Sequence, residues 1–151
     1  MKKLFVLIFS IFLLIGCTNN NSEDKIYLES RYYNMDDFNP IDKDTLNSQL
    51  DNKDTFLLFT YNNYCNLPVA CEGIFEEFMD KNNIGIDSIA YKYYKETTLH
   101  EKVVYAPSVI IIKDGEVVDY LDANSDDDFD KYQNTREFTK WISSYINLNE
   151  E

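Results

Sequence analysis

The sequence predicts a three-layer α/β fold in which a central mixed sheet is flanked by helices. Three patterns predict it. An almost uninterrupted apolar run over 55–61 is typical of a strand that is buried on both faces, as in the centre of a parallel sheet. Two short apolar stretches, 108–113 and 116–121, surround an Asp-Gly pair and indicate a hairpin. Apolar residues recur at helical spacing over 138–146, which indicates a helix that packs one face against a core.

The other elements follow from the same kind of pattern. Apolar side chains between 74 and 79 share one helical face, so we expect a helix there. Asp42 or Asp44 suits the start of an earlier helix, because a carboxylate accepts hydrogen bonds from the free N–H groups of a first turn. In chain order, we expect a strand over 26–33, a helix over 41–50, the central strand over 55–61, a helix over 72–82, a strand over 86–94, a weak helix over 95–104, the hairpin and the C-terminal helix.

The composition limits the range of functions. The chain has 151 residues, which suggests one domain. Its four glycines are scattered, and this excludes a Rossmann fingerprint or a P-loop, which need clustered glycines. The single histidine, His100, excludes a multi-histidine metal site, and we expect it on the solvated surface. With 14 basic and 27 acidic side chains the net charge is −13, so the chain repels phosphate backbones. We expect no nucleic-acid partner, no cofactor and no bound metal ion.

The first 17 residues have the pattern of a targeting segment. Lys2 and Lys3 precede an apolar run over 4–15, which is short for a bilayer span but fits the hydrophobic region of a signal peptide. The run ends in Leu-Ile-Gly-Cys, which resembles the bacterial lipobox. That resemblance implies cleavage before Cys17 and a lipid on its sulfur. An uncleaved N-terminal anchor helix is the alternative.

The lipobox resemblance divides the chain into a lipoprotein signal peptide over 1–16, a lipidated flexible tether over 17–25 and a folded domain over 26–151. A lipid would then anchor the mature protein to the extracytoplasmic face of a bacterial cell membrane. Disulfides persist in that compartment. The two remaining cysteines, Cys65 and Cys71, therefore form either a structural disulfide or a reactive pair.

Three stretches resemble the thioredoxin-like superfamily. The stretch FLLFTYNNYC, which ends at Cys65, resembles the family's buried strand and first catalytic cysteine, with Tyr64 where tryptophan is usual. The stretch Tyr-Ala-Pro-Ser over 105–108 resembles the turn that holds the family's cis proline ahead of a strand. The hairpin over 109–118 resembles the family's closing hairpin.

The resemblance implies a membrane-tethered thiol–disulfide oxidoreductase that acts on thiols or disulfides of extracytoplasmic proteins. Cys65 would attack the partner, and Cys71 would resolve the mixed disulfide. Pro107 would be cis, and the backbone of Ala106, together with Tyr64, would contact the partner peptide. A helix N-terminus suits this chemistry, because its partial positive charge lowers a thiol pKa and so favours the attacking thiolate.

The sequence also departs from the family pattern. Five residues, rather than two, separate Cys65 from Cys71. A helix that starts near Asn66 would rise roughly 9 Å between the cysteines and place them on different faces. That is too far for a disulfide, whose Cα atoms lie within about 7 Å, whereas a helix that starts later avoids the problem. Phe59 stands where the family has a buried acid, and Asp122 stands where it has a glycine.

These departures favour an alternative function, a non-catalytic thioredoxin-fold binding or accessory module in which the cysteine pair is a structural disulfide. The acidic stretch 122–133 also spaces its carboxylates like a calcium-binding loop. Asp127 stands where such a loop needs Gly, however, and Gln133 stands where it needs Glu. We therefore interpret this stretch as a solvated loop.

Overall fold

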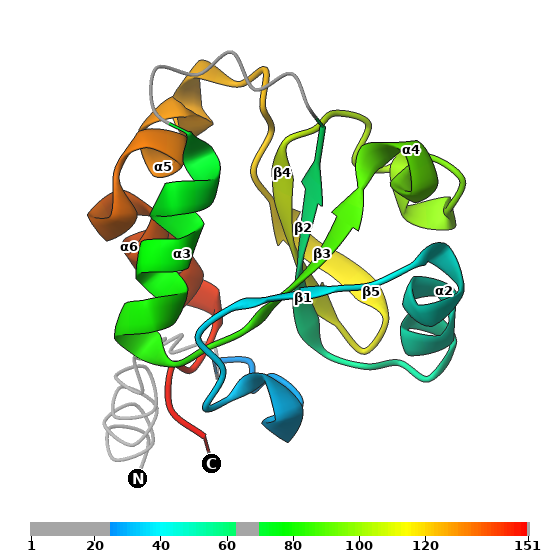
Figure 1. The fold of residues 1–151 in the computed structure, drawn as a ribbon, viewed down its shortest axis with the longest axis horizontal. Helices are drawn as coiled ribbons and strands as arrows, with labels where there is room; N and C mark the ends of the chain where they lie inside the picture. The colour runs from blue at the N-terminus through cyan, green and yellow to red at the C-terminus, as the bar shows by residue number, and fades with distance from the viewer. Residues whose placement is uncertain (1–24, 63–69, 151) are drawn as a thin grey trace, which may run out of the picture.

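The computed structural model describes residues 25–62 and 70–150, and their centre is a mixed sheet (Figure 1). Within the described residues the sheet has five strands in the order β1-β3-β2-β4-β5. The first three of these are parallel, whereas β4 runs antiparallel to both β2 and β5. The strands are β1 (Phe38–Pro40), β2 (Phe56–Tyr61), β3 (Ile86–Ala90), β4 (Ser108–Lys113) and β5 (Glu116–Tyr120).

Helices cover both faces of this sheet, which gives the three layers that the sequence predicts (Figure 1). One face is covered by α3 (Cys71–Asn82), α5 (Phe129–Gln133) and α6 (Thr135–Tyr145). The other face carries α2 (Lys43–Asp51) and the short α4 (Tyr91–Tyr94). The described residues also form three short 3-10 helices, η1 (Ser30–Tyr32) ahead of β1, η2 (Thr98–Glu101) and η3 (Asp126–Asp128).

The central strand β2 is buried along nearly its whole length because both of its faces are covered by helices. Its side chains alternate between the two faces, so Phe59 faces the layer of α3 and stacks edge-on against Phe75. Phe75 in turn packs against Phe138 of α6, with ring centroids 4.6 Å apart. A continuous aromatic core therefore joins β2, α3 and α6 and fixes the position of α3 on the sheet.

The structure confirms the predicted central strand, hairpin and C-terminal helix. It also settles the start of α2, where the Asp42 carboxylate accepts a hydrogen bond from the backbone N–H of Thr45 at 2.8 Å. In the hairpin, Asp114 and Gly115 both have positive φ, as a two-residue turn between right-twisted strands requires.

The predicted strand over 26–33 is wrong. Ile26 forms only an isolated bridge with Ile146, and the edge strand β1 lies further along the chain. The reason is tertiary: Tyr33 is buried, and its hydroxyl donates to the carbonyl oxygen of Asn147 at 3.0 Å. This contact and a few isolated backbone hydrogen bonds, such as that from Glu29 to Thr55, hold the segment in place without a continuous ladder.

Two other expected boundaries are wrong. The strand expected over 86–94 ends at Ala90, because the chain turns there into α4. The last residue of that helix, Tyr94, is fully buried. The helix expected over 95–104 is reduced to η2. A stretch rich in tyrosine suits a strand by propensity, but here tertiary burial of Tyr94 decides the local conformation.

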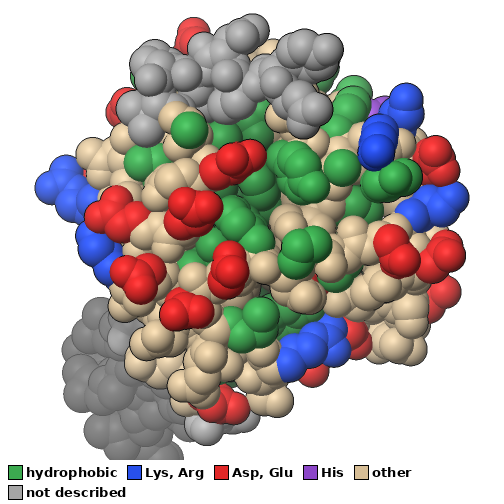
Figure 2. Space-filling model, viewed as in Figure 1, with side chains coloured by type: hydrophobic (Ala, Val, Ile, Leu, Met, Phe, Trp, Pro, Cys, Tyr) green, Lys and Arg blue, Asp and Glu red, His purple; other side chains and the backbone are tan. Residues whose placement is uncertain are grey.

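The surface of α3 is acidic. Its exposed positions include Glu72, Glu76, Glu77 and Asp80, and Figure 2 shows Asp and Glu side chains gathered over this helix. Hydrophobic side chains are visible beside them, over the sheet. Part of the negative charge of the chain therefore lies on α3, next to the exposed hydrophobic side chains over the sheet.

Candidate functional site

Cys71 is the first residue of α3, and its side chain is 2% exposed. Ala70 precedes it in an extended conformation and supplies no side-chain cap to the helix. The helix therefore begins after the five-residue spacer, and Cys71 lies in its first turn. This start agrees with the sequence alternative in which the helix begins late in the spacer rather than near Asn66. The free N–H groups of a first turn favour negative charge nearby.

Three of the predicted site residues lie outside the described part of the chain. They are Cys65 and Tyr64, in the segment 63–69, and Cys17, in the segment 1–24. The predicted attack by Cys65, its disulfide with Cys71 and the lipid on Cys17 therefore stay predictions. The same holds for the predicted signal peptide over 1–16.

The other two predicted site residues form the turn before β4. The Ala106–Pro107 peptide bond is cis, as the resemblance implies. The carbonyl oxygen of Ala106 accepts a hydrogen bond from Nδ2 of Asn62, 3.0 Å away. Asn62 directly follows β2, so this hydrogen bond joins the end of the central strand to the turn. The sequence analysis did not single out Asn62.

Tyr132 of α5 connects this turn to the neighbourhood of Cys71. Its hydroxyl oxygen lies 2.8 Å from the Pro107 carbonyl oxygen and 2.9 Å from that of Leu121, and its one proton is shared between these acceptors. Burial raises the pKa of Tyr132 well above its ordinary value, and the negative charge of a Cys71 thiolate raises it further. Tyr132 therefore hydrogen-bonds to the turn at Pro107 and lies close enough to Cys71 for the charges of the two groups to interact.

The sequence analysis missed Tyr132 because it lies in the acidic stretch 122–133, which was expected to be a solvated loop. That expectation is wrong, since the stretch forms η3 and α5 and buries the Tyr132 ring. Asp128 contributes to its fold: one carboxylate oxygen accepts from the backbone N–H of Asp122 at 2.9 Å, and the other from Lys131 at 2.5 Å. The sequence held no clear signal for this burial, because the other aromatic residue of the run, Phe129, is 44% exposed.

His100 stands close to the same turn and is partly buried, where the sequence analysis expected a solvated residue. Its Nε2 lies 3.0 Å from the hydroxyl oxygen of Tyr91, which itself donates to the carbonyl oxygen of Val104 at 2.6 Å. Because a hydroxyl has one proton, Nε2 of His100 is the donor to Tyr91. The pair anchors the backbone just before the turn.

The position six residues before Cys65 holds no acid. Phe59 is buried there, stacked on Phe38 with ring centroids 5.3 Å apart. The neighbouring strand places Ser88 beside it in register. No carboxylate among the described residues occupies this part of the core, so a proton acceptor on β2 near the cysteines is missing.

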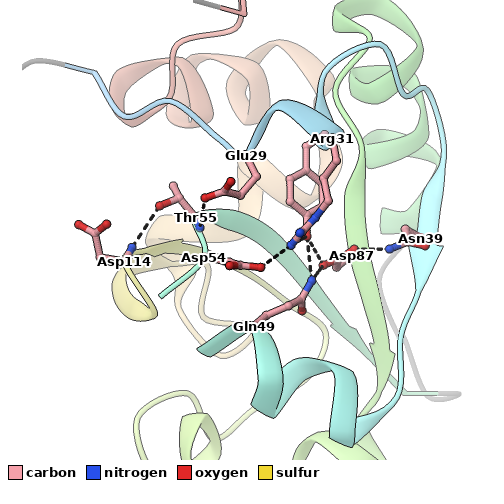
Figure 3. Close-up of polar contacts among 9 residues, drawn as sticks. Glu29, Arg31, Asn39, Gln49, Asp54, Thr55, Asp87 and Asp114 are labelled. Carbon is pink, nitrogen blue, oxygen red and sulfur yellow. Dashed lines mark hydrogen bonds and ion pairs between the residues drawn. The ribbon is translucent and has the colours of Figure 1, made fainter. Parts of the chain in front are cut away.

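The described residues do contain a buried carboxylate, Asp87, next to Leu58 in the register of β2 and β3 (Figure 3). It accepts hydrogen bonds from the Tyr32 hydroxyl at 2.5 Å, from Gln49 at 2.8 Å and from Asn39 at 2.6 Å. Arg31 lies at the edge of the same network and pairs with Asp54 at 2.6 Å. Because Asp87 is held by three donors from η1, α2 and β1, its role is structural.

Within the described residues, no group of three or more His, Cys, Asp or Glu side chains could hold a metal ion. The same part of the chain contains no helix that is both long and apolar enough to cross a membrane.

Solved structures of thioredoxins resemble this fold. A mutant thioredoxin from Halobacterium salinarum superposes with a TM-score of 0.53 at 17% sequence identity, over 76% of this chain and 96% of that one. A thioredoxin from Arabidopsis thaliana in the oxidised state gives a TM-score of 0.51 at 10% identity, over 73% and 95% of the two chains. No protein-family model and no curated protein matches the sequence. The chain therefore has a thioredoxin-like fold, as the sequence predicts, and identities this low establish the fold alone.

Proposed function

We propose that this protein is a membrane-tethered thiol–disulfide oxidoreductase that acts on extracytoplasmic proteins through Cys65 and Cys71. The observation that carries the proposal is the position of Cys71. It begins α3 on a thioredoxin-like fold, and Tyr132, which hydrogen-bonds to the turn at Pro107, interacts electrostatically with it. A cysteine at a helix N-terminus beside a turn that exposes backbone is the arrangement that thiol exchange on a peptide needs.

The proposed reaction has two exchange steps. The Cys65 thiolate attacks one sulfur of a partner disulfide, which forms a mixed disulfide and releases the partner's other sulfur as a thiolate. The Cys71 thiolate then attacks the sulfur of Cys65, which forms the Cys65–Cys71 disulfide and releases the second partner thiolate. The partner disulfide is reduced by two electrons, and the cysteine pair is oxidised by two. The reverse sequence oxidises a partner dithiol.

The burial of Cys71 supports its role as the resolving residue. A thiol that is 2% exposed is shielded from a large partner, so the proposal assigns it the attack on a sulfur of the same chain. The first attack therefore falls to Cys65. Because Cys71 sits in the first turn of α3, the partial positive charge of the helix end favours its thiolate when it attacks.

The direct test traps the mixed disulfide. In Cys71→Ser the resolving step is blocked, so Cys65 should stay bound to its partners and yield adducts that a reducing agent releases. Cys65→Ser is the matched control and should yield none. If Cys71→Ser, shown to be folded by circular dichroism, traps no partner in intact cells, thiol exchange through this pair is excluded.

The reduction potential of the cysteine pair separates a reactive bond from a structural one. After equilibration in glutathione buffers of graded potential, the mass after alkylation reports the oxidised fraction. We expect a potential above about −250 mV, in the range of exchangeable disulfides. A value below about −300 mV is typical of a structural disulfide and would contradict the proposal.

One observation favours a second candidate, a non-catalytic binding or accessory module in which Cys65 and Cys71 form a structural disulfide. Phe59 fills the core where an acid would accept a proton during exchange, and it is enclosed by Phe38 and Phe75. This candidate predicts that Cys65→Ser keeps biological function. Loss of function in a folded Cys65→Ser variant that still binds its partner would exclude it.

The membrane tether in the proposal rests on the sequence of the first 17 residues. We expect the chain to incorporate labelled fatty acid and to sediment with membranes, on the extracytoplasmic side. Cys17→Ala should abolish the label and leave residues 1–16 attached. Equal labelling of the two chains would refute a lipid on Cys17.

A further inference from the structure

The strongest unassigned feature of the molecule is a small surface pocket between α3 and the β1 edge of the sheet. It has a volume of about 170 Å³ and lies where Figure 2 shows hydrophobic side chains beside the acidic surface of α3. Its wall on the sheet consists of Phe38, Phe59, Tyr61 and Ser88, and its wall on α3 consists of Glu72 and Glu76. Cys71, the cysteine in the described part of the chain, does not line it.

The sheet wall of the pocket is aromatic. The Phe38 ring stacks on Phe59 with centroids 5.3 Å apart and planes 28° from parallel. Tyr61 continues the row at 5.8 Å from Phe59. Phe59 is 2% exposed, so the ring surface that the row offers to the pocket belongs to the partly buried Phe38 and Tyr61. The face of an aromatic ring carries the negative part of its quadrupole and attracts a cation.

The helical wall is anionic. Glu72 and Glu76 are four residues apart and so lie on one face of α3, one turn from each other. Both are exposed, and neither forms an ion pair with any described residue. By contrast, Glu77 on the same helix is paired with Lys81. The two carboxylates that line the pocket therefore have no basic partner among the described residues, whereas the carboxylate of Glu77, which does not line it, has Lys81.

The sheet wall also carries a hydroxyl group. Ser88 is 6% exposed as a residue and lines the pocket, and its hydroxyl makes no hydrogen bond to another described residue. The hydroxyl oxygen is not among the fully buried polar atoms, so it keeps some accessible surface. Ser88 can therefore serve a donor or acceptor that enters the pocket.

The size of the pocket selects the kind of occupant. At about 170 Å³ it is smaller than the roughly 300–1,000 Å³ of sites that enclose whole small-molecule ligands. It suits a single side chain that projects from a larger partner. A guanidinium group fits both walls at once, because it stacks flat on aromatic rings and donates paired hydrogen bonds to carboxylates. The ammonium of lysine is a point charge and makes the second kind of contact less well.

We propose that this pocket binds an arginine side chain of a partner protein, with the guanidinium between the aromatic row and Glu72 and Glu76. The net charge of −13 agrees with a basic partner. This goes beyond thiol exchange, because binding requires neither cysteine. The pocket begins one residue after Cys71, however, so an arginine held there would place the partner's backbone close to the start of α3.

The test is a titration of the isotope-labelled full chain in a non-ionic detergent, followed by amide resonances in NMR. The probe is the blocked peptide Gly-Arg-Gly. Matched peptides carry citrulline, which has the same shape without the charge, or lysine. We expect the arginine peptide to shift the amides of Phe59, Tyr61 and Ser88, the lysine peptide to bind more weakly, and the citrulline peptide to have no effect.

Two variants locate the site. The double variant Glu72→Gln, Glu76→Gln should weaken binding about fivefold or more, whereas Asp80→Asn, which removes a charge elsewhere on α3, should leave binding unchanged. Phe38→Leu keeps an apolar side chain but removes a ring and should also weaken binding.

The proposal is overturned if citrulline shifts the same amides as arginine, if lysine binds as well as arginine, or if the double variant binds as the parent does. Because the titration involves no redox step, these outcomes are independent of the cysteine experiments. Failure of cysteine trapping would leave the pocket assignment intact, and failure of peptide binding would leave the thiol chemistry intact.

Discussion

The side-chain amide of Asn62 donates a hydrogen bond to the carbonyl oxygen of Ala106 over 3.0 Å, and so joins the end of β2 to the residue that precedes Pro107. The two residues are 44 positions apart in the chain. The contact matters for the candidate site because it uses one acceptor position of the Ala106 backbone. A partner strand that pairs with Ala106 must therefore use its N–H or the second lone pair of its carbonyl oxygen.

We expect Asn62→Ala to lower the free energy of unfolding by about 0.5–1.5 kcal/mol, because one part-buried hydrogen bond is lost. Urea unfolding followed by Trp141 fluorescence measures this. Asn124→Ala, at an exposed position whose side chain makes no hydrogen bond to the described residues, is the control and should leave stability unchanged. Equal stability of all three chains would show that Asn62 does not hold the turn.

The two glycines Gly73 and Gly115 should respond to alanine in opposite directions. Gly115 has a φ of +78°, and a Cβ there would lie 2.5 Å from the carbonyl oxygen of Leu50. Gly115→Ala should therefore destabilise the protein by more than about 1 kcal/mol. Gly73 is helical with open space around it, so Gly73→Ala should stabilise it by about 0.5–1 kcal/mol. Urea midpoints that move in the same direction for both would contradict this.

Stability should fall at alkaline pH because of buried tyrosines. Burial, followed by the hydrogen bond to Asp87, raises the pKa of Tyr32 above its ordinary 10.0, and burial also raises that of Tyr94. The unfolded chain thus loses these protons first as the pH rises. The stabilisation is complete below the unfolded pKa and is lost as the pH rises toward the raised folded pKa, so the free energy of unfolding should begin to decrease near pH 9 and fall continuously above about pH 10.

Tyr32→Phe isolates one of these groups. It should make the alkaline decrease shallower, since one raised pKa is removed. At neutral pH it should also cost about 1.5–3 kcal/mol, because the buried carboxylate of Asp87 loses a donor that lies 2.5 Å away. Tyr27→Phe, at an exposed tyrosine, is the control. An unchanged slope in Tyr32→Phe would contradict the assignment.

Tyr132→Phe should lower the free energy of unfolding by about 1–3 kcal/mol. The Pro107 carbonyl oxygen loses its donor in a buried site, whereas Leu121 keeps a second donor in the hydroxyl of Ser108. Urea unfolding measures the loss, and Tyr93→Phe, at an exposed ring, serves as the comparison. If the two variants are equally stable, the Tyr132 hydroxyl does not hold the turn.

Local patterns in the sequence were sufficient for most of the fold. The uninterrupted apolar run marked β2, the Asp-Gly pair marked the hairpin, and Asp42 marked the start of α2. Each of these signals depends on residues that are close in the chain. The failures, at 26–33 and after Ala90, fall where a tyrosine is buried by residues distant in sequence, because propensity does not register such contacts.

The features of the candidate site also fall into those that the sequence indicated and those that depend on tertiary contacts. The sequence by itself determined the resemblance to thioredoxin-like proteins and the absence of an acid at Phe59, because these depend on residue types along the chain, and the resemblance in turn implied the cis proline at Pro107. Only the tertiary structure decided that Tyr132 is buried and bound to the turn at Pro107, and that an aromatic pocket faces two glutamates. Those features depend on contacts among α3, α5 and the sheet. Contacts between segments that are distant in the chain cannot be recognised from the pattern of any short stretch of sequence.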